Sequence, residues 1–218
     1  MADAQKFWDK TAAKYAQSPV SDQKTYERKL AETREFLQPD MRILEFGCGT
    51  GTTAVHHAPN VHHIEAVDIS QNMLDIGQQK ASEAGISNIS FTRGTLLEVA
   101  AEAGSLDAVL GLNVLHLLPD RRETIAEAAR ILKPGGLFVT STVCLTGSPL
   151  RFIRYVAPLA RLIGLMPDLF IFSEAELAEE LTSAGFEIER QWHHAKDGIA
   201  VFIIARKAGG SGAAQAPG

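Results

Sequence analysis

The sequence predicts an α/β protein with a doubly wound, mostly parallel sheet that ends in an antiparallel hairpin. Apolar, β-branched runs alternate with segments of helical period, and several of these runs are apolar at consecutive positions. Consecutive apolar positions are typical of strands that helices cover on both faces. After residue 173 the chain predicts a capped helix, a strand, a tight turn at Lys196-Asp197-Gly198 and a final antiparallel strand.

Each element before the hairpin has its own local signal. The runs expected to form strands are 41–46, 62–67, 88–92, 106–112 and 136–143. The helix predicted over 70–85 opens on Ser70 as an N-cap and ends at Gly85. The helix over 119–136 begins after a proline and ends at Pro-Gly-Gly. Such alternation gives right-handed crossovers, which place a ligand at the carboxyl ends of the strands.

The domain organisation follows from length and from the two ends. With 218 residues and 45% hydrophobic side chains, the chain suits one domain with a buried sheet, which we expect over 1–206. Residues 3–17 and 22–37 resemble helices, so 1–38 is predicted to cap the carboxyl end of the first strand. The small and polar residues of 207–218 predict a disordered tail.

Composition and charge favour a small-molecule partner. The formal charge of -5 and a pI near 5.8 argue against a nucleic-acid binder, which usually carries a basic face.

Cys48 and Cys144 match no CxxC pattern, and charges interrupt the N-terminus where a secretory signal has its apolar core. We therefore expect a cytoplasmic protein.

The stretch ILEFGCGTGTTA, from Ile43 to Ala54, predicts the ligand class. It places three glycines within five residues, directly after an apolar run. In the dinucleotide fingerprint GxGxxG a third glycine would stand where this chain has Thr52, and no Lys-Ser/Thr pair follows as in a P-loop. Asp68 ends the second strand, where a carboxylate can accept hydrogen bonds from ribose hydroxyls. Together the loop and the acid predict an adenosine-type ligand without a pyrophosphate clamp.

Four motifs in order resemble the class I S-adenosylmethionine-dependent methyltransferases. They are LEFGCGTG, VDIS at the end of the second strand, LNVLHLLPD after the fourth and LKPGG before the fifth. The resemblance covers roughly residues 7–206 and implies a Rossmann-like sheet of seven strands with an inserted antiparallel strand. The chain is most similar to the small-molecule branch of the ubiquinone and menaquinone type. Asn113-Val114-Leu115-His116 departs from the Asn/Asp-Pro-Pro-Tyr motif of the nucleic-acid and protein-glutamine branches.

The resemblance implies a set of cofactor-binding residues. Gly47 and Gly49 would let the cofactor approach the backbone, Asp68 would bind the ribose, and Glu45 would hold the amino group through water. Thr95 stands where the family often has an acid that bonds the adenine amino group. The expected set is Tyr15, Glu45, Gly47, Cys48, Gly49, Gly51, Asp68, Ile69, Met73, Gly94, Thr95, Leu96 and Asn113.

The histidines carry two separate expectations. His116 follows the fourth strand, where the acceptor meets the methyl group, and is the candidate catalytic residue; a packing role is the alternative. His56-His57, His62-His63 and His193-His194 are neighbours in sequence, and neighbouring side chains on one element point to different sides. We expect these pairs to be solvated and to bind no metal.

The segment 146–172 bears on the acceptor. It carries Arg151, Arg154 and Arg161 in an otherwise apolar helix that Pro158 interrupts, at the place where the family builds a substrate lid. Its apolar face would close over a greasy acceptor or rest on a membrane surface from which a lipid or quinone precursor is drawn. Core packing or a dimer surface is a third interpretation.

These observations together predict a methyltransferase. A methyl group would pass from S-adenosylmethionine to a small, apolar or lipid-like acceptor by in-line displacement. The sulfonium leaves as a neutral group, so no general acid is required. Two alternatives stay open: an NAD(P)-type oxidoreductase of the same fold, disfavoured by Thr52, and a regulatory protein that binds the cofactor without catalysis. The acceptor atom and the oligomeric state cannot be read from the sequence.

Overall fold

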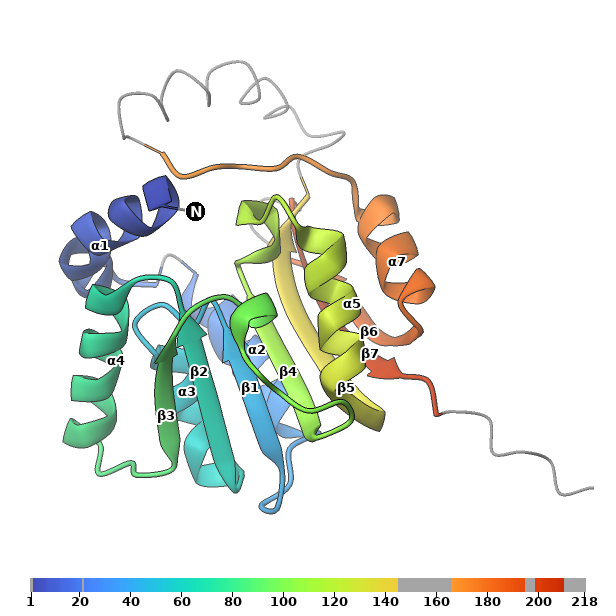
Figure 1. The fold of residues 1–218 in the computed structure, drawn as a ribbon, viewed down its shortest axis with the longest axis horizontal. Helices are drawn as coiled ribbons and strands as arrows, with labels where there is room; N and C mark the ends of the chain where they lie inside the picture. The colour runs from blue at the N-terminus through green and yellow to red at the C-terminus, as the bar shows by residue number, and fades with distance from the viewer. Residues whose placement is uncertain (1, 21, 145–165, 195–198, 210–218) are drawn as a thin grey trace, which may run out of the picture.

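A seven-stranded sheet forms the centre of the molecule (Figure 1). The computed structural model describes residues 2–20, 22–144, 166–194 and 199–209. The strand order is β3-β2-β1-β4-β5-β7-β6. Neighbouring strands are parallel except at β7, which is antiparallel to both β5 and β6. The strands are β1 (Arg42–Phe46), β2 (His63–Asp68), β3 (Ile89–Arg93), β4 (Leu106–Leu112), β5 (Leu132–Val143), β6 (Phe186–His193) and β7 (Ala200–Lys207). This confirms the expected fold class, including the inserted antiparallel strand.

Helices cover both faces of the sheet. The described helices are α1 (Ala2–Gln17), α2 (Gln23–Arg34), α3 (Thr52–His57), α4 (Gln71–Glu83), α5 (Arg121–Ile131) and α7 (Glu174–Ser183), with short 3-10 turns η1 (Ala58–Asn60), η2 (Leu96–Glu98) and η3 (Leu115–Leu117). Alternate residues of β1 face opposite sides, as expected for a strand. Leu44 packs in the core with α5 and α7, whereas Ile43 packs in the core with α3 and α4. The sheet therefore has one hydrophobic core on each face, and the alternation of side chains along each strand decides which core a residue joins.

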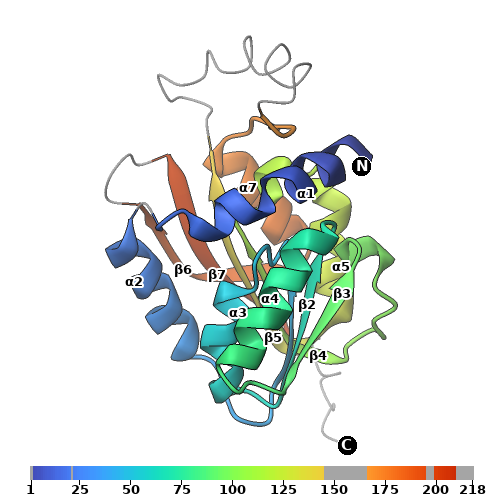
Figure 2. The same cartoon turned by 90° about the vertical axis from the view of Figure 1, so that its left-hand side faces the viewer.

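The two N-terminal helices take different places. Figure 2, turned by 90° from Figure 1, shows α1 beside α4, where it crosses the carboxyl ends of the strands. In contrast, α2 packs on the sheet through its buried face, which includes Lys29 and Thr33. Trp192 of β6 donates from Nε1 to Glu32 Oε2 of α2 at 2.9 Å, so this helix also contacts the terminal hairpin.

The junction between α5 and β5 differs from the sequence prediction. The α5 helix ends at Ile131, before the Pro-Gly-Gly stretch, and Leu132 is already extended with φ -72° and ψ 141°. Pro134 disfavours a helical backbone at the residue before it, which explains the early end. β5 begins there and shifts register against β4 between Leu106 and Ala108.

Some expectations fall outside the described residues. These are the part of the predicted lid up to residue 165, the turn at 196–198 and residues 210–218 of the predicted tail. Within the described part of the chain, no helix combines the length and the apolar character needed to cross a membrane.

Candidate functional site

The three glycines after β1 meet different surroundings. A Cβ added to Gly47 would lie 2.5 Å from Val114 Cγ2, and one added to Gly51 would lie 2.9 Å from Phe91 Cε1. These two glycines therefore permit close packing of protein on protein. A Cβ added to Gly49 would meet nothing within 4 Å, although its φ of +54° still favours glycine. Gly49 is thus the glycine of the loop that leaves open space for a ligand.

Asp68 holds the loop in place from the end of β2. Its Oδ2 accepts from the Gly49 N–H and its Oδ1 accepts from the Ser70 N–H, both at 2.9 Å. The side chain is buried, which raises the pKa of this carboxyl, while the two backbone hydrogen bonds act in the opposite direction. Each carboxylate oxygen has two lone pairs, so one on each oxygen stays available to a ligand.

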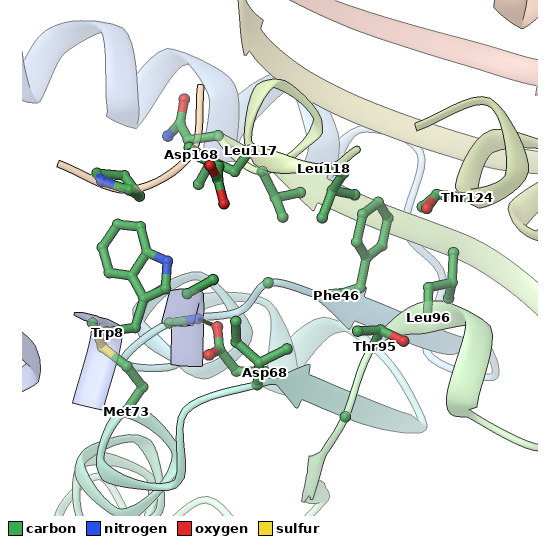
Figure 3. Close-up of a pocket in the computed structure, with 18 of the residues that line it drawn as sticks. Trp8, Phe46, Asp68, Met73, Thr95, Leu96, Leu117, Leu118, Thr124 and Asp168 are labelled. Carbon is green, nitrogen blue, oxygen red and sulfur yellow. Dashed lines mark hydrogen bonds between the residues drawn. The ribbon is translucent and has the colours of Figure 1, made fainter. Parts of the chain in front are cut away.

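A pocket opens at the carboxyl ends of β1, β2 and β4, with Asp68 inside it (Figure 3). Figure 3 shows Trp8 and Met73 at one end, Phe46, Leu96 and Thr124 at the other, and Leu117 and Leu118 across from Asp68. Ten of the sequence-predicted residues line it: Tyr15, Gly47, Gly49, Asp68, Ile69, Met73, Gly94, Thr95, Leu96 and Asn113. The predicted residues Glu45, Cys48, Gly51 and His116 are not among its lining residues.

Further lining residues were not predicted as site residues. They are Ala4, Trp8, Phe46, Leu112, Val114, Leu117, Leu118, Pro119, Asp120, Thr124, Pro167 and Asp168. The stretch from Leu112 to Asp120 coincides with the third motif, LNVLHLLPD, and Phe46 precedes the glycine loop, so their neighbourhood was visible in the sequence. Pro167 and Asp168 lie in the segment 146–172 that was predicted to form a substrate lid, although neither was named as a site residue.

Glu45 and Cys48 lie buried behind the glycine loop. Burial, together with the charge of Asp68, raises the pKa of Glu45 to about 8. The carboxyl is therefore mostly neutral at pH 7, and its Oε2 has no hydrogen-bond partner within the described residues. Burial also raises the pKa of the Cys48 thiol, which keeps it protonated and suits a packing role.

The Thr95 hydroxyl, at the position of the acid in the family motif, donates its proton within the protein. The N–H and the hydroxyl of Thr95 both donate to Glu98 Oε2, at 2.9 and 3.1 Å. This capping box opens η2 and uses the hydroxyl proton of Thr95. A ligand at this end of the pocket would meet that hydroxyl only as an acceptor.

His116 lies beside the pocket. Its Nδ1 is 3.1 Å from Thr142 Oγ1, and its carbonyl accepts from the Phe170 N–H at 2.8 Å. Burial lowers the pKa of His116 to about 4, so the ring is neutral at pH 7. The catalytic role stays a prediction.

The expectation that the histidine pairs are solvated is wrong for His57. His56 is exposed, but His57 is 0% exposed and neither ring nitrogen has a partner within the described residues. Helical spacing explains it, because His57 shares the inner face of α3 with Thr53 and Ala54. Burial lowers the pKa of His57 to about 4.

The Asp9 carboxylate of α1 forms hydrogen bonds that hold this helix over the pocket. Asp9 Oδ1 accepts from Ser70 Oγ at 2.6 Å and from the Asn72 N–H at 3.3 Å. Asn72 Nδ2 also donates to the Asp9 carbonyl, at 2.9 Å. The hydrogen bond from Ser70 is the main reason that the pKa of Asp9 is lowered. The Ser70 N–H also donates to Asp68, so Ser70 links α1 to the acid that faces the ligand.

Comparison with known proteins finds a family match across the strands that carry the pocket. Residues 43–136 match the family described as a methyltransferase domain. The match begins in β1 and ends in β5, so it contains the glycine loop, Asp68 and the turn after β4.

One curated relative aligns with more of the chain than the segment 43–136. A ubiquinone biosynthesis O-methyltransferase from Hahella chejuensis is 30% identical over 157 residues, which cover 69% of this chain and 64% of that protein. The chain thus spans less than two thirds of the length of that relative.

Two solved structures show the fold at low identity. The geranyl diphosphate C-methyltransferase from Streptomyces coelicolor has a TM-score of 0.70 and 16% identity, covering 95% of this chain and 97% of that one. The cyclase SpnF has a TM-score of 0.73 and 20% identity, covering 89% and 86%. A methyltransferase and a cyclase share this fold, so the reaction has to be argued from the site.

Proposed function

We propose that the protein transfers a methyl group from S-adenosylmethionine to a small-molecule acceptor. The observation that carries the proposal is the Asp68 carboxylate, held by the Gly49 and Ser70 N–H groups inside the pocket of a methyltransferase domain. A carboxylate placed at the end of the second strand is suited to a ribose with two free hydroxyls.

The residues present fit this cofactor. Asp68 has lone pairs free for the ribose, and the space over Gly49 admits a group close to the backbone. Glu45, which does not line the pocket, has an unbonded carboxyl oxygen that would reach the amino group of the methionine part through water. Ile69, with Leu117 across the pocket, offers apolar surface to the adenine ring.

The protein would contribute to the reaction by holding the two reactants and by covering the pocket. S-Adenosylmethionine supplies, when bound, a methyl group on a sulfonium that departs as a neutral thioether. The side of the pocket away from the sheet is lined by Trp8 of α1 and by Pro167 and Asp168 of the segment before α7. These residues would exclude water from the bound reactants. In-line alignment of the acceptor supplies the remaining gain in rate.

For the acceptor, we propose a small apolar or lipid-like molecule. The name of the Hahella relative refers to ubiquinone biosynthesis, and the lining of the pocket includes Leu112, Leu117 and Leu118. An NAD-type oxidoreductase is the second candidate by fold. Against it, Thr52 replaces the third glycine of the dinucleotide loop, and its hydroxyl accepts a hydrogen bond from Lys80 Nζ at 2.8 Å.

Calorimetry tests the cofactor. We expect S-adenosylhomocysteine to bind and NAD not to bind. Replacing Asp68 by Ala should weaken S-adenosylhomocysteine by about 2 kcal/mol or more, as expected when charge-assisted hydrogen bonds are lost. Asp107→Ala is the control, because Asp107 also accepts a backbone N–H, from Arg42 at 2.8 Å, but at the amino end of β4. Binding of NAD alone would refute the proposal.

Turnover tests catalysis. The protein is incubated with labelled S-adenosylmethionine and a panel of phenols, quinols and lipid amines. Methylation of a phenol or quinol is the expected result. Tight binding of S-adenosylhomocysteine without transfer to any acceptor would favour the regulatory alternative.

A further inference from the structure

A polar cluster near the carboxyl ends of β4, β5 and β6 meets the pocket through Asn113. It joins Lys29 of α2, Ser141 of β5, Asn113 after β4 and His194 after β6. Lys29 is 6% exposed, and its Nζ donates to Ser141 Oγ at 2.8 Å. Ser141 Oγ lies 3.3 Å from Asn113 Oδ1 and 3.3 Å from His194 Nε2.

The direction of these hydrogen bonds follows from the chemistry of the lysine. An ammonium group has only donors, so Ser141 Oγ accepts from Lys29 and has to pass its own proton onward. The acceptors in reach are Asn113 Oδ1 and His194 Nε2. A bond to Asn113 turns the amide oxygen toward Ser141 and the NH₂ group away from it. Within the described residues, no protein atom accepts a hydrogen bond from Asn113 Nδ2.

The backbone of Asn113 is held by the same strand. Its φ is +58°, and among the described residues it is the non-glycine residue in the left-handed region. Asparagine tolerates this region better than most residues. The Asn113 N–H donates to the Ser141 carbonyl at 2.6 Å. Asn113 is exposed and lines the pocket, so Ser141 fixes both its backbone and its amide at the pocket wall.

We propose that Lys29, acting through Ser141, holds the Asn113 amide so that its NH₂ group donates a hydrogen bond to an oxygen of the bound ligand. Lys29 is then a positioning residue, and Asn113 is the residue that meets the ligand. The oxygen has two sources, the carboxylate of the methyl donor or an oxygen of the acceptor. The proposed function is needed only to name these ligands.

Side-chain amide NMR tests the positioning without any ligand. The Asn113 NH₂ signals are assigned by their loss in Asn113→Gly, which keeps the left-handed backbone free of strain. We expect Lys29→Met to shift or broaden these signals and Lys24→Met to leave them unchanged, since Lys24 is exposed on the same helix. Ser141→Ala is a second variant, in case Lys29→Met does not fold. Unchanged amide signals in Lys29→Met, or in Ser141→Ala if only that variant folds, would overturn the positioning role.

Calorimetry identifies the ligand oxygen. Asn113→Gly is titrated with S-adenosylhomocysteine and with its aminopropyl analogue, which lacks the carboxylate. If the oxygen belongs to the methyl donor, S-adenosylhomocysteine weakens about tenfold and the analogue keeps its affinity, as expected for one hydrogen bond to a charged group. If it belongs to the acceptor, both affinities stay and the KM of the acceptor rises about tenfold with kcat nearly unchanged.

The two hypotheses fail in different ways. Equal affinities and equal KM in Asn113→Gly and the wild type would overturn the donor role of Asn113. Failure of the proposed function would instead appear as no binding of S-adenosylhomocysteine by the wild-type protein. In that case the amide signals of Asn113 would still depend on Lys29.

Discussion

A substitution at Gly49 should affect ligand binding and protein stability through two different physical causes. It lines the pocket, has φ +54° and has open space where a Cβ would stand. Gly49→Ala should lower the free energy of unfolding by about 1 kcal/mol through left-handed strain. It should also weaken S-adenosylhomocysteine about tenfold or more, because the methyl group occupies space that the ligand uses. Urea unfolding and calorimetry measure the two effects.

Gly85 provides the matched control for this prediction. It has φ +68°, also has nothing within 4 Å of an added Cβ, and follows the C-terminal end of α4. Gly85→Ala should lose similar stability, about 1 kcal/mol, and keep full affinity. Equal losses of affinity in both variants would mean that strain, and not occupied space, weakens binding.

At the scale of elements, α1 acts as a cover whose attachment depends on Asp9. Asp9→Ala removes the hydrogen bonds from Ser70 Oγ and the Asn72 N–H. We expect hydrogen exchange of residues 2–17 to become faster and S-adenosylhomocysteine to weaken by about 1–2 kcal/mol, since charge-assisted bonds are lost. Reciprocally, ligand binding should slow exchange of α1 in the wild type, because the two equilibria are linked.

Asp3→Ala is the control for the α1 prediction. Asp3 is an exposed acid in the first turn of the same helix and makes no hydrogen bond to α4 within the described residues. Exchange and affinity should stay at wild-type values in this variant. If Asp9→Ala behaved in the same way, α1 would be held by packing alone.

Elements with local signals were predictable from the sequence. Ser70 caps α4 by accepting from the Met73 N–H at 3.2 Å, and Ser173 forms a capping box at α7. Such signals lie within four residues of one another, so they are visible without a fold. The doubly wound, mostly parallel sheet with an antiparallel terminal strand followed from the alternation of elements and from the resemblance.

Features that depend on tertiary packing were not predictable. The side of α3 that meets the sheet decides the burial of His57, and six residues are too few to show a period. The contact of Gly47 with Val114 requires the loop after β4 to return beside the glycine loop. Trp8 lies in the predicted cap and Asp168 in the predicted lid, but their contact with the pocket likewise depends on tertiary packing and was not predicted for either residue.

For the whole molecule, three buried groups with large pKa shifts give opposing contributions to the pH dependence of stability. The pKa of Glu45 rises from 4.5 to about 8 on folding, so the folded state holds a proton that the unfolded state releases. Stability contributed by this group is present below pH 4.5 and is lost as the pH rises toward 8. The pKa values of His57 and His116 fall from 6.5 to about 4, so their contribution is present above pH 6.5 and is lost as the pH falls.

The opposing slopes predict a stability maximum near pH 6.5 in the free protein. One proton contributes about 1.4 kcal/mol per pH unit. Between pH 4.5 and 6.5 the two histidines outweigh Glu45, so stability rises with pH; between pH 6.5 and 8 Glu45 acts alone among these three, so stability falls. Glu45→Gln should remove the falling limb, and His57→Leu should flatten the rising one. Urea unfolding at half-unit pH steps measures both limbs, and a falling limb that persists in Glu45→Gln would assign it to another group.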